Sequence, residues 1–168
     1  MRNSAGGVMQ IFIDADAFPN SIRDILIKAS VRLNLPLIFV ANKPLRLEEM
    51  ENLSLIVVPG GPDVADDRIV NLAQPGDLVI TADIPLADRV VNKQAFAMNP
   101  RGMLYTEHNI KDRLAMRDLL SGLRDTGTIT GGPAQFDKKD RRNFANQLDS
   151  FLVRQLKIEN EMQRKPLP

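Results

Sequence analysis

Cysteine is absent from this chain of 168 residues, and histidine occurs only once, as His108. The lack of cysteine excludes disulfide bonds, zinc sites built on thiolates and a cysteine nucleophile. It also fits a reducing compartment, so we expect a cytoplasmic protein. A single histidine argues against a zinc ion held by imidazole ligands.

Long apolar runs and aromatic residues are also scarce. No apolar run reaches the length that crosses a bilayer, and residues 1–8 contain no hydrophobic segment of a secretory signal. Aromatic residues make up 5% of the chain, which gives little support for a surface that stacks single-stranded bases. We therefore expect no membrane contact, and one soluble domain over residues 9–160 with flexible ends at 1–8 and 161–168.

Charge is distributed unevenly along the chain. Residues 1–100 carry 9 Lys/Arg against 12 Asp/Glu, whereas residues 101–168 carry 13 against 9, giving net charges of −3 and +4. A metal site followed by a phosphate-binding flank has this distribution, although differences of this size also arise by chance.

Apolar runs alternate with amphipathic segments over most of the chain. Runs at 8–13, 35–40, 55–58 and 77–81 predict strands, and 96–98 predicts a short fifth one. Helices are expected after Pro19 and over 64–73, 85–93, 107–124 and 137–159. Strands that are apolar on both faces and separated by helices predict an α/β fold: a three-layer α/β/α arrangement around a mainly parallel sheet.

Acidic residues follow three of the predicted strands. Because ligands bind at the carboxyl ends of strands in open parallel sheets, we expect these carboxylates to meet at one edge. Crowded carboxylates repel one another, and a hard divalent cation such as Mg²⁺ or Mn²⁺ relieves that repulsion. The candidate metal ligands are Asp14, Asp16, Asp63, Asp66, Asp67, Asp83 and Asp88.

Structural roles compete with metal binding for most of these acids. Asp63, Asp66 and Asp67 are also suited to capping the helix that follows, or to its first turn, and Asp88 to pairing with a neighbouring arginine. Asp14 is hardest to explain structurally, because an acid that closes a buried strand has no packing reason to be acidic.

Basic and glycine-rich segments in the second half are candidates for binding substrate phosphates. Arg101, Arg141 and Arg142 carry positive charge, and Thr130 and Gly131 begin a turn whose backbone N–H groups suit an anion. The competing interpretation is that these arginines are solvated surface residues and that Gly131-Gly132-Pro133 is only a turn.

Long motifs throughout the chain carry a family resemblance. They are IDADAFP at 13–19, ANKPL at 41–45, DVADD at 63–67, LVITADIPLA at 78–87, NPRGMLYTEHNI at 99–110, MRDLL at 116–120, TGGPAQF at 130–136 and DRRNFANQLD at 140–149. From about Met9 to Arg154 the chain closely resembles the YaiI/YqxD family of uncharacterised bacterial proteins. That family is regarded as related to PIN-like nuclease domains, so the resemblance implies a PIN-like fold with an acidic metal site.

The resemblance also implies roles for particular residues. Asp14 matches the first-strand acid of PIN-like domains, and Thr81-Ala82-Asp83 matches their Thr-x-Asp. Asp14 and Asp83 are thus the candidate catalytic residues, Asp88 is a later acid, and Thr81 joins the phosphate-binding candidates. Family members often have Cys-Pro where this chain has Phe18-Pro19.

Three functions follow from these observations. The leading expectation is a Mg²⁺- or Mn²⁺-dependent phosphodiesterase that cleaves RNA or another nucleic acid with activated water. The second is a non-catalytic PIN-like module that binds nucleic acid or protein. The third is a haloacid-dehalogenase-like phosphatase with Asp14 as nucleophile and Asp16 as acid, although Phe18 and the absence of evident later motifs depart from that pattern.

Overall fold

The computed structural model describes residues 7–16, 18–130 and 135–164. Its strands are β1 (Ile11–Asp14), β2 (Leu37–Ala41), β3 (Leu53–Val57), β4 (Leu78–Ile80), β5 (Phe96–Met98) and β6 (Leu104–Tyr105). Its helices are the 3-10 turn η1 (Asn20–Ile22), α1 (Arg23–Leu33), α2 (Val64–Leu72), α3 (Ile84–Asn92), α4 (Glu107–Asp125) and α5 (Lys138–Arg164).

The six strands form one sheet in the order β3-β2-β1-β4-β5-β6. All neighbouring pairs are parallel except β5 and β6, which are antiparallel. The chain first builds outward from β1 through β2 to β3, and then returns to place β4 on the other side of β1. The order of the strands therefore reverses between β1 and β4, which is where open parallel sheets bind ligands.

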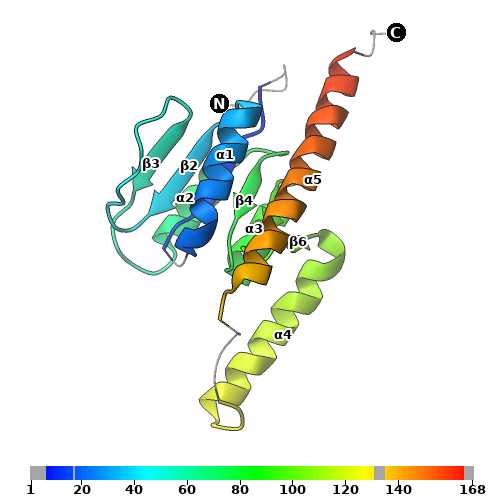
Figure 1. Ribbon diagram of the computed structural model, residues 1–168. Coiled ribbons are helices and arrows are strands. Elements are labelled where there is room, and N and C mark those ends of the chain that lie inside the picture. The colour runs from blue at the N-terminus through cyan, green and yellow to red at the C-terminus, as the bar shows by residue number, and fades with distance from the viewer. Residues whose placement is uncertain (1–6, 17, 131–134, 165–168) are drawn as a thin grey trace.

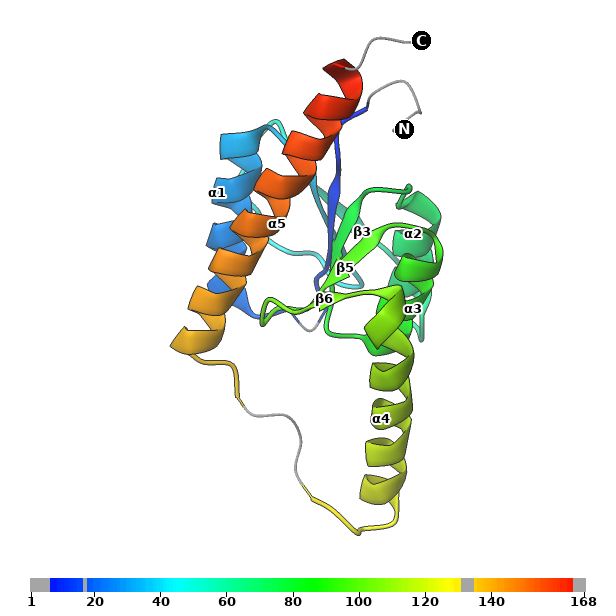
Figure 2. The same cartoon turned by 90° about the vertical axis from the view of Figure 1, so that its right-hand side faces the viewer.

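Helices cover both faces of this sheet, as Figures 1 and 2 show: α1 and α5 lie on one face, and α2 and α3 lie on the other. Consecutive residues of a strand point to opposite faces. Accordingly Ile11 and Ile13 of β1 join the core beneath α1 and α5, while Phe12 joins the core beneath α2 and α3. The predicted three-layer α/β/α fold with a mainly parallel sheet is confirmed.

The last helix completes one of the two cores. Four α5 side chains are at most 2% exposed and pack against the sheet: Phe144, Leu148, Phe151 and Leu152. The ring of Phe151 stands edge-on to that of Phe96 in β5, with the centroids 5.0 Å apart. This helix continues to Arg164, four residues beyond the predicted end of the domain. No helix in the described part of the chain is long and apolar enough to span a membrane.

The first four strands have boundaries a few residues from those predicted, and one strand was not predicted. β1 begins at Ile11 rather than Val8, because its partners Leu37 and Leu78 begin at that level of the sheet. β6 was not predicted, since two residues are too few to show a period. It pairs through Ala97 with Tyr105 and brings the chain back along β5 after a short turn.

Candidate functional site

A cleft of about 390 Å³ lies at the carboxyl end of β1 and β4, where the strand order reverses. Five of the predicted acids line it, together with neutral residues from the same sheet edge. The lining is Asp14, Asp16, Phe18, Asn42, Gly61, Asp63, Ala65, Asp66, Thr81, Ala82, Asp83 and Pro100. The predicted meeting of acids from β1, β3 and β4 is therefore present in the structure.

Asp14 is held in place by Thr81, which is 1% exposed. The Thr81 hydroxyl donates to Asp14 Oδ2 at 2.8 Å and accepts from the Asp83 backbone N–H at 3.0 Å. Burial raises the pKa of the Asp14 carboxyl, and the Thr81 hydrogen bond opposes that shift. Thr81 was a candidate for binding phosphate, but its hydroxyl here orients a carboxylate and ties the ends of β1 and β4 together.

Asp83 combines a cleft position with a structural role. It is the N-cap of α3, where its Oδ1 accepts from the Leu86 backbone N–H at 3.0 Å. Pro85, in the first turn of α3, has no backbone N–H to leave unpaired. The cap fixes the Asp83 carboxyl group at the cleft while committing only one of its two oxygens to the helix.

Asp66 carries the clearest electrostatic signature of crowding. Burial raises its pKa to about 7, and the Asp83, Asp14 and Asp63 carboxylates add to the shift, as does a hydrogen bond with Asp83. A carboxyl group that holds its proton near neutral pH marks uncompensated negative charge in the cleft.

Asp63 stands at the start of α2 with a left-handed backbone, φ 63°, and its side chain makes no capping hydrogen bond. Aspartate tolerates this conformation better than most residues do. Of the two roles considered for Asp63, capping is therefore not realised, and its side chain faces the cleft instead.

Asp16 and Asn42 connect the loop after β1 to the end of β2. The Asn42 backbone N–H donates to Asp16 Oδ1 at 2.9 Å, and both residues line the cleft. Asn42 was not among the predicted site residues. The available signal was its position directly after β2, by the same strand-end argument that selected the acids.

Asp67 and Asp88 do not line the cleft, although both were candidate metal ligands. Asp67 Oδ1 lies 2.8 Å from Arg89 Nη1, and Asp88 Oδ1 lies 2.7 Å from Lys111 Nζ. Each residue of a helix is rotated about 100° from the one before, so Asp67 leaves the face that Asp66 occupies. The ion pair considered for Asp88 is present, with a lysine in place of an arginine.

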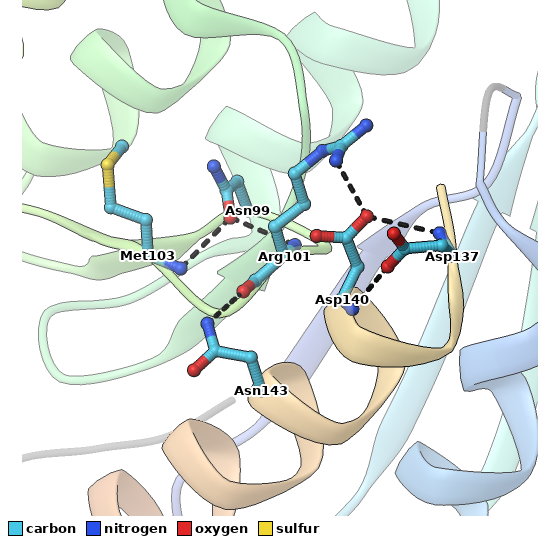
Figure 3. A network of polar contacts seen from close by, with 6 residues as sticks. All are labelled: Asn99, Arg101, Met103, Asp137, Asp140 and Asn143. Carbon is cyan, nitrogen blue, oxygen red and sulfur yellow. Dashed lines mark hydrogen bonds and ion pairs between the residues drawn. The ribbon is translucent and has the colours of Figure 1, made fainter. Parts of the chain in front are cut away.

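Arg101 lies next to the cleft-lining Pro100 and is part of a polar network (Figure 3). Its Nη1 donates to Asp140 Oδ2 at 2.7 Å, and Asn143 of α5 donates to its backbone carbonyl. Asp140 and Asp137 also accept each other's backbone N–H. This network joins the turn between β5 and β6 to the start of α5, so the charge of Arg101 is already engaged.

The other basic candidates lie away from the cleft or are engaged elsewhere. Arg141 donates to the Ser21 carbonyl at 2.9 Å and to Asp24 Oδ2 at 2.7 Å, which ties α5 to the start of α1. Arg142 lines a separate cavity on α5 with Lys139 and Asn146. Thr130 is exposed after α4, and Gly131 lies outside the described residues.

The donor set of the cleft consists of oxygen atoms, chiefly carboxylates, with no Lys, Arg or His among the described lining residues. Oxygen ligands suit Mg²⁺ and Mn²⁺. Burial raises the pKa values of Asp14 and Asp66, and the neighbouring carboxylates raise them further. In the described part of the chain, no group of three or more His, Asp or Glu side chains is close enough together to hold a metal ion as it stands.

Comparison with known proteins places this architecture in a family. A family model described as "Uncharacterized BCR, YaiI/YqxD family" matches residues 12–154. The chain belongs to the YaiI/YqxD family. The matched residues include all five cleft aspartates and the four buried α5 side chains. The matched region therefore contains both the cleft and the part of α5 that packs against the sheet.

Relatives of the YaiI/YqxD chain are similar over nearly their full length. It is 53% identical to the UPF0178 protein of Maridesulfovibrio salexigens over 148 residues, 88% of this chain and 98% of the relative. It is 54% identical to that of Trichlorobacter lovleyi over 149 residues (89% and 97%). For the UPF0178 protein of Solidesulfovibrio magneticus the identity is 55% over 144 residues (86% and 96%). No solved structure matches the chain significantly.

Proposed function

We propose that this YaiI/YqxD protein is a PIN-like, metal-dependent phosphodiesterase that hydrolyses RNA or another nucleic acid. The observation that carries the proposal is the cleft at the reversal of strand order, where five aspartates gather without a Lys, Arg or His among the described lining residues. Several structural carboxylates elsewhere in the described chain pair with a cation, as Asp67 and Asp88 do, and Asp77 accepts hydrogen bonds from backbone N–H groups. Carboxylates left without a cationic partner support a site for a cation that comes from solution.

Mg²⁺ or Mn²⁺ is the cofactor that this donor set fits, with Asp14, Asp66 and Asp83 as the central ligands and Asp16 and Asp63 beside them. When bound, the ion would balance the charge of a phosphodiester and activate water for attack on phosphorus. Asp14 and Asp83 are the candidate catalytic residues.

The chain's own residues supply positioning and proton handling. Thr81 fixes the orientation of Asp14, and the α3 cap fixes Asp83, so two carboxylates are held before any ligand arrives. Asp66 has a pKa of about 7 and must give up its proton to become a full ligand. Metal binding and hydrolysis should therefore strengthen as pH rises through 7.

The charge distribution supports a polyanionic substrate. Residues 101–168 carry a net charge of +4 and include α5, whose first turn borders the network beside Pro100. A net positive charge of this half of the chain suits a polyanionic substrate, while the nearby Arg101 and Arg141 are themselves paired with Asp140 and Asp24. The absence of cysteine supports a cytoplasmic location for this activity.

The proposal is tested by incubating the protein with short single-stranded RNA or DNA and Mn²⁺ or Mg²⁺. Wild type and Asp88→Asn, whose site lies outside the cleft, should cleave at similar rates. Asp14→Asn should lower the rate at least about a hundredfold, because it removes a carboxylate from the site where charge develops. EDTA should abolish cleavage.

Equal cleavage by wild type and Asp14→Asn would contradict the proposal, since the activity would then come from a contaminant. Binding of metal and RNA by both proteins without cleavage by either would favour the alternative of a non-catalytic nucleic-acid-binding module.

A further inference from the structure

Arg23, the first residue of α1, has a partly buried guanidinium group without a carboxylate partner among the described residues. Its Nε is buried and has no hydrogen-bond partner, while its Nη2 donates to Asn20 Oδ1 at 3.1 Å. Leaving a buried N–H of a charged group unpaired is costly, so such a group calls for an explanation. The Nη end of the same guanidinium lies at an exposed position, where a negatively charged acceptor from solution can balance its charge.

Arg23 and a residue of the cleft pack against the same buried ring. Its Cζ lies 5.9 Å from the centroid of the Phe39 ring, and the Phe18 ring stands edge-on to that same ring at 6.2 Å. Phe18 lines the cleft. Because α1 follows β1 in a parallel sheet, its first residue lies at the carboxyl edge, the edge that carries Asp14.

Other arginines near this edge differ from Arg23 in their partners. Arg101 pairs with Asp140 and Arg141 pairs with Asp24, each at 2.7 Å. Their charges are balanced within the protein, and their planar donors are occupied. Arg23 has no carboxylate to balance its charge among the described residues, and only its Nη end is open to an acceptor from solution.

We propose that Arg23 binds a phosphate of the substrate strand adjacent to the phosphate that is hydrolysed, and that Phe18 forms the apolar wall of this subsite. A guanidinium presents two N–H donors in the geometry of phosphate oxygens. The inference rests on the proposed function, because it needs a phosphodiester substrate at the aspartates. It narrows the substrate class to strands of three or more nucleotides, since a dinucleotide has only the one phosphodiester that is hydrolysed.

The test measures binding of a five-nucleotide single-stranded RNA in Mg²⁺ by fluorescence anisotropy at several salt concentrations. Arg23→Gln should weaken binding about tenfold, because a hydrogen bond between charged groups is lost. It should also reduce the slope of log affinity against log salt by about 0.7, the value for one phosphate contact on a single strand. Arg23→Lys should keep most of the slope. Lys28→Gln, which removes an exposed cation from the same helix, should leave both quantities unchanged.

Thermal unfolding separates binding from folding. Removing an unpaired buried N–H should leave the unfolding temperature of Arg23→Gln equal to wild type or higher. Arg23→Met, which keeps an unbranched apolar stem against Phe39, is a second variant if the first does not fold, and it should show the same loss of affinity.

The outcomes distinguish this inference from the proposed function. Wild-type affinity and slope in a folded Arg23→Gln or Arg23→Met variant would overturn the subsite and leave the hydrolytic proposal intact. RNA binding that depends on Arg23, without cleavage, would support the subsite while contradicting hydrolysis. A wild-type protein that binds no RNA would overturn both.

Discussion

The acidic cleft and the outer surfaces of α2 and α3 contain aspartates from the same two helices or their caps, yet they differ in charge balance. On the outer surfaces, Asp67 pairs with Arg89 and Asp88 pairs with Lys111. In the cleft, Asp66 has no cationic partner and its pKa rises to about 7. Sequence neighbours can therefore have opposite electrostatic environments.

This difference separates the acids that stabilise the fold from those that suit a ligand. An exposed ion pair changes the free energy of unfolding little. Its carboxylate is already paired, so it needs no cation from solution. A group of half-buried carboxylates is unfavourable until a proton or a cation joins it. Substitutions in matched pairs, one in the cleft and one outside it, can test the distinction.

The largest expected effect is on metal affinity. Asp83→Asn should weaken Mn²⁺ binding at least about tenfold, because an amide replaces a charged oxygen ligand while still capping α3. Asp88→Asn, on the same helix but outside the cleft, should bind Mn²⁺ as wild type does. Isothermal titration calorimetry at pH 8 measures both affinities. Equal losses of Mn²⁺ affinity in the two variants would show that the cleft aspartate matters no more for metal binding than the aspartate on the outer surface.

Thr81→Val should produce the largest loss of stability. It leaves the Asp14 carboxylate and the Asp83 backbone N–H without their shared partner, at a cost of about 2 kcal/mol in the free energy of unfolding. It should also raise the pKa of Asp14 further, because the Thr81 hydrogen bond lowers it. Urea denaturation and carboxyl NMR shifts provide the measurements. Thr81→Ser retains the hydroxyl and should lose much less; a Ser variant as unstable as the Val variant would point to packing alone.

Asp66→Asn should increase the free energy of unfolding at neutral and alkaline pH, but not at acid pH. The pKa of Asp66 rises from 3.8 to about 7 on folding, so the folded state binds the proton more tightly. Its contribution is fully present below pH 3.8 and is lost as pH rises towards 7. The gain from the Asn substitution should thus be near zero at pH 4 and reach roughly 1 kcal/mol at pH 8, a value reduced because Asp66 is only half-buried and solvent screens it.

Asp67→Asn is the matched control on α2 for this measurement. Its effect on the free energy of unfolding should not grow with pH between 4 and 8. A pH-independent effect of Asp66→Asn, or an equal rise in both variants, would contradict the electrostatic account of the cleft.

The smallest effect is expected for the outer ion pairs. A double-mutant cycle with Asp67→Asn and Arg89→Met should give a coupling free energy of at most about 0.5 kcal/mol, because both side chains are largely exposed, at 60% and 44%. A coupling free energy above 2 kcal/mol would show that this exposed ion pair stabilises the fold substantially.

Strand-end reasoning predicted much of the fold and part of the cleft. Asp14 and Asp83 could be placed because each follows a short apolar run, and parallel strands end at a common edge. The same reasoning applied to β2 would have added Asn42. The alternation of strands and helices could also be predicted from the sequence, since strands buried on both faces are apolar throughout.

The orientation of the helical acids could not be read in this way. Whether Asp66 or Asp67 faces the cleft depends on the rotation of α2 and on Arg89, which is 22 residues away in sequence. Asp88 likewise pairs with Lys111 of α4. Arg23 was not predicted as a site residue, because its unpaired Nε is seen only in the folded structure, where its guanidinium packs over Phe39. These are tertiary contacts, which a local pattern does not contain.

The position of α5 has a consequence for synthesis of the protein on the ribosome. The core on one face of the sheet is completed by Phe144, Leu148, Phe151 and Leu152, which follow all six strands in sequence. A nascent chain that has emerged only as far as α4 leaves part of that apolar face open, because Phe96 of β5 lacks the Phe151 ring that packs edge-on against it. The network between Arg101 and the start of α5 forms only after this helix leaves the exit tunnel, so the β5–β6 turn beside the cleft gains these contacts later than the rest of the sheet.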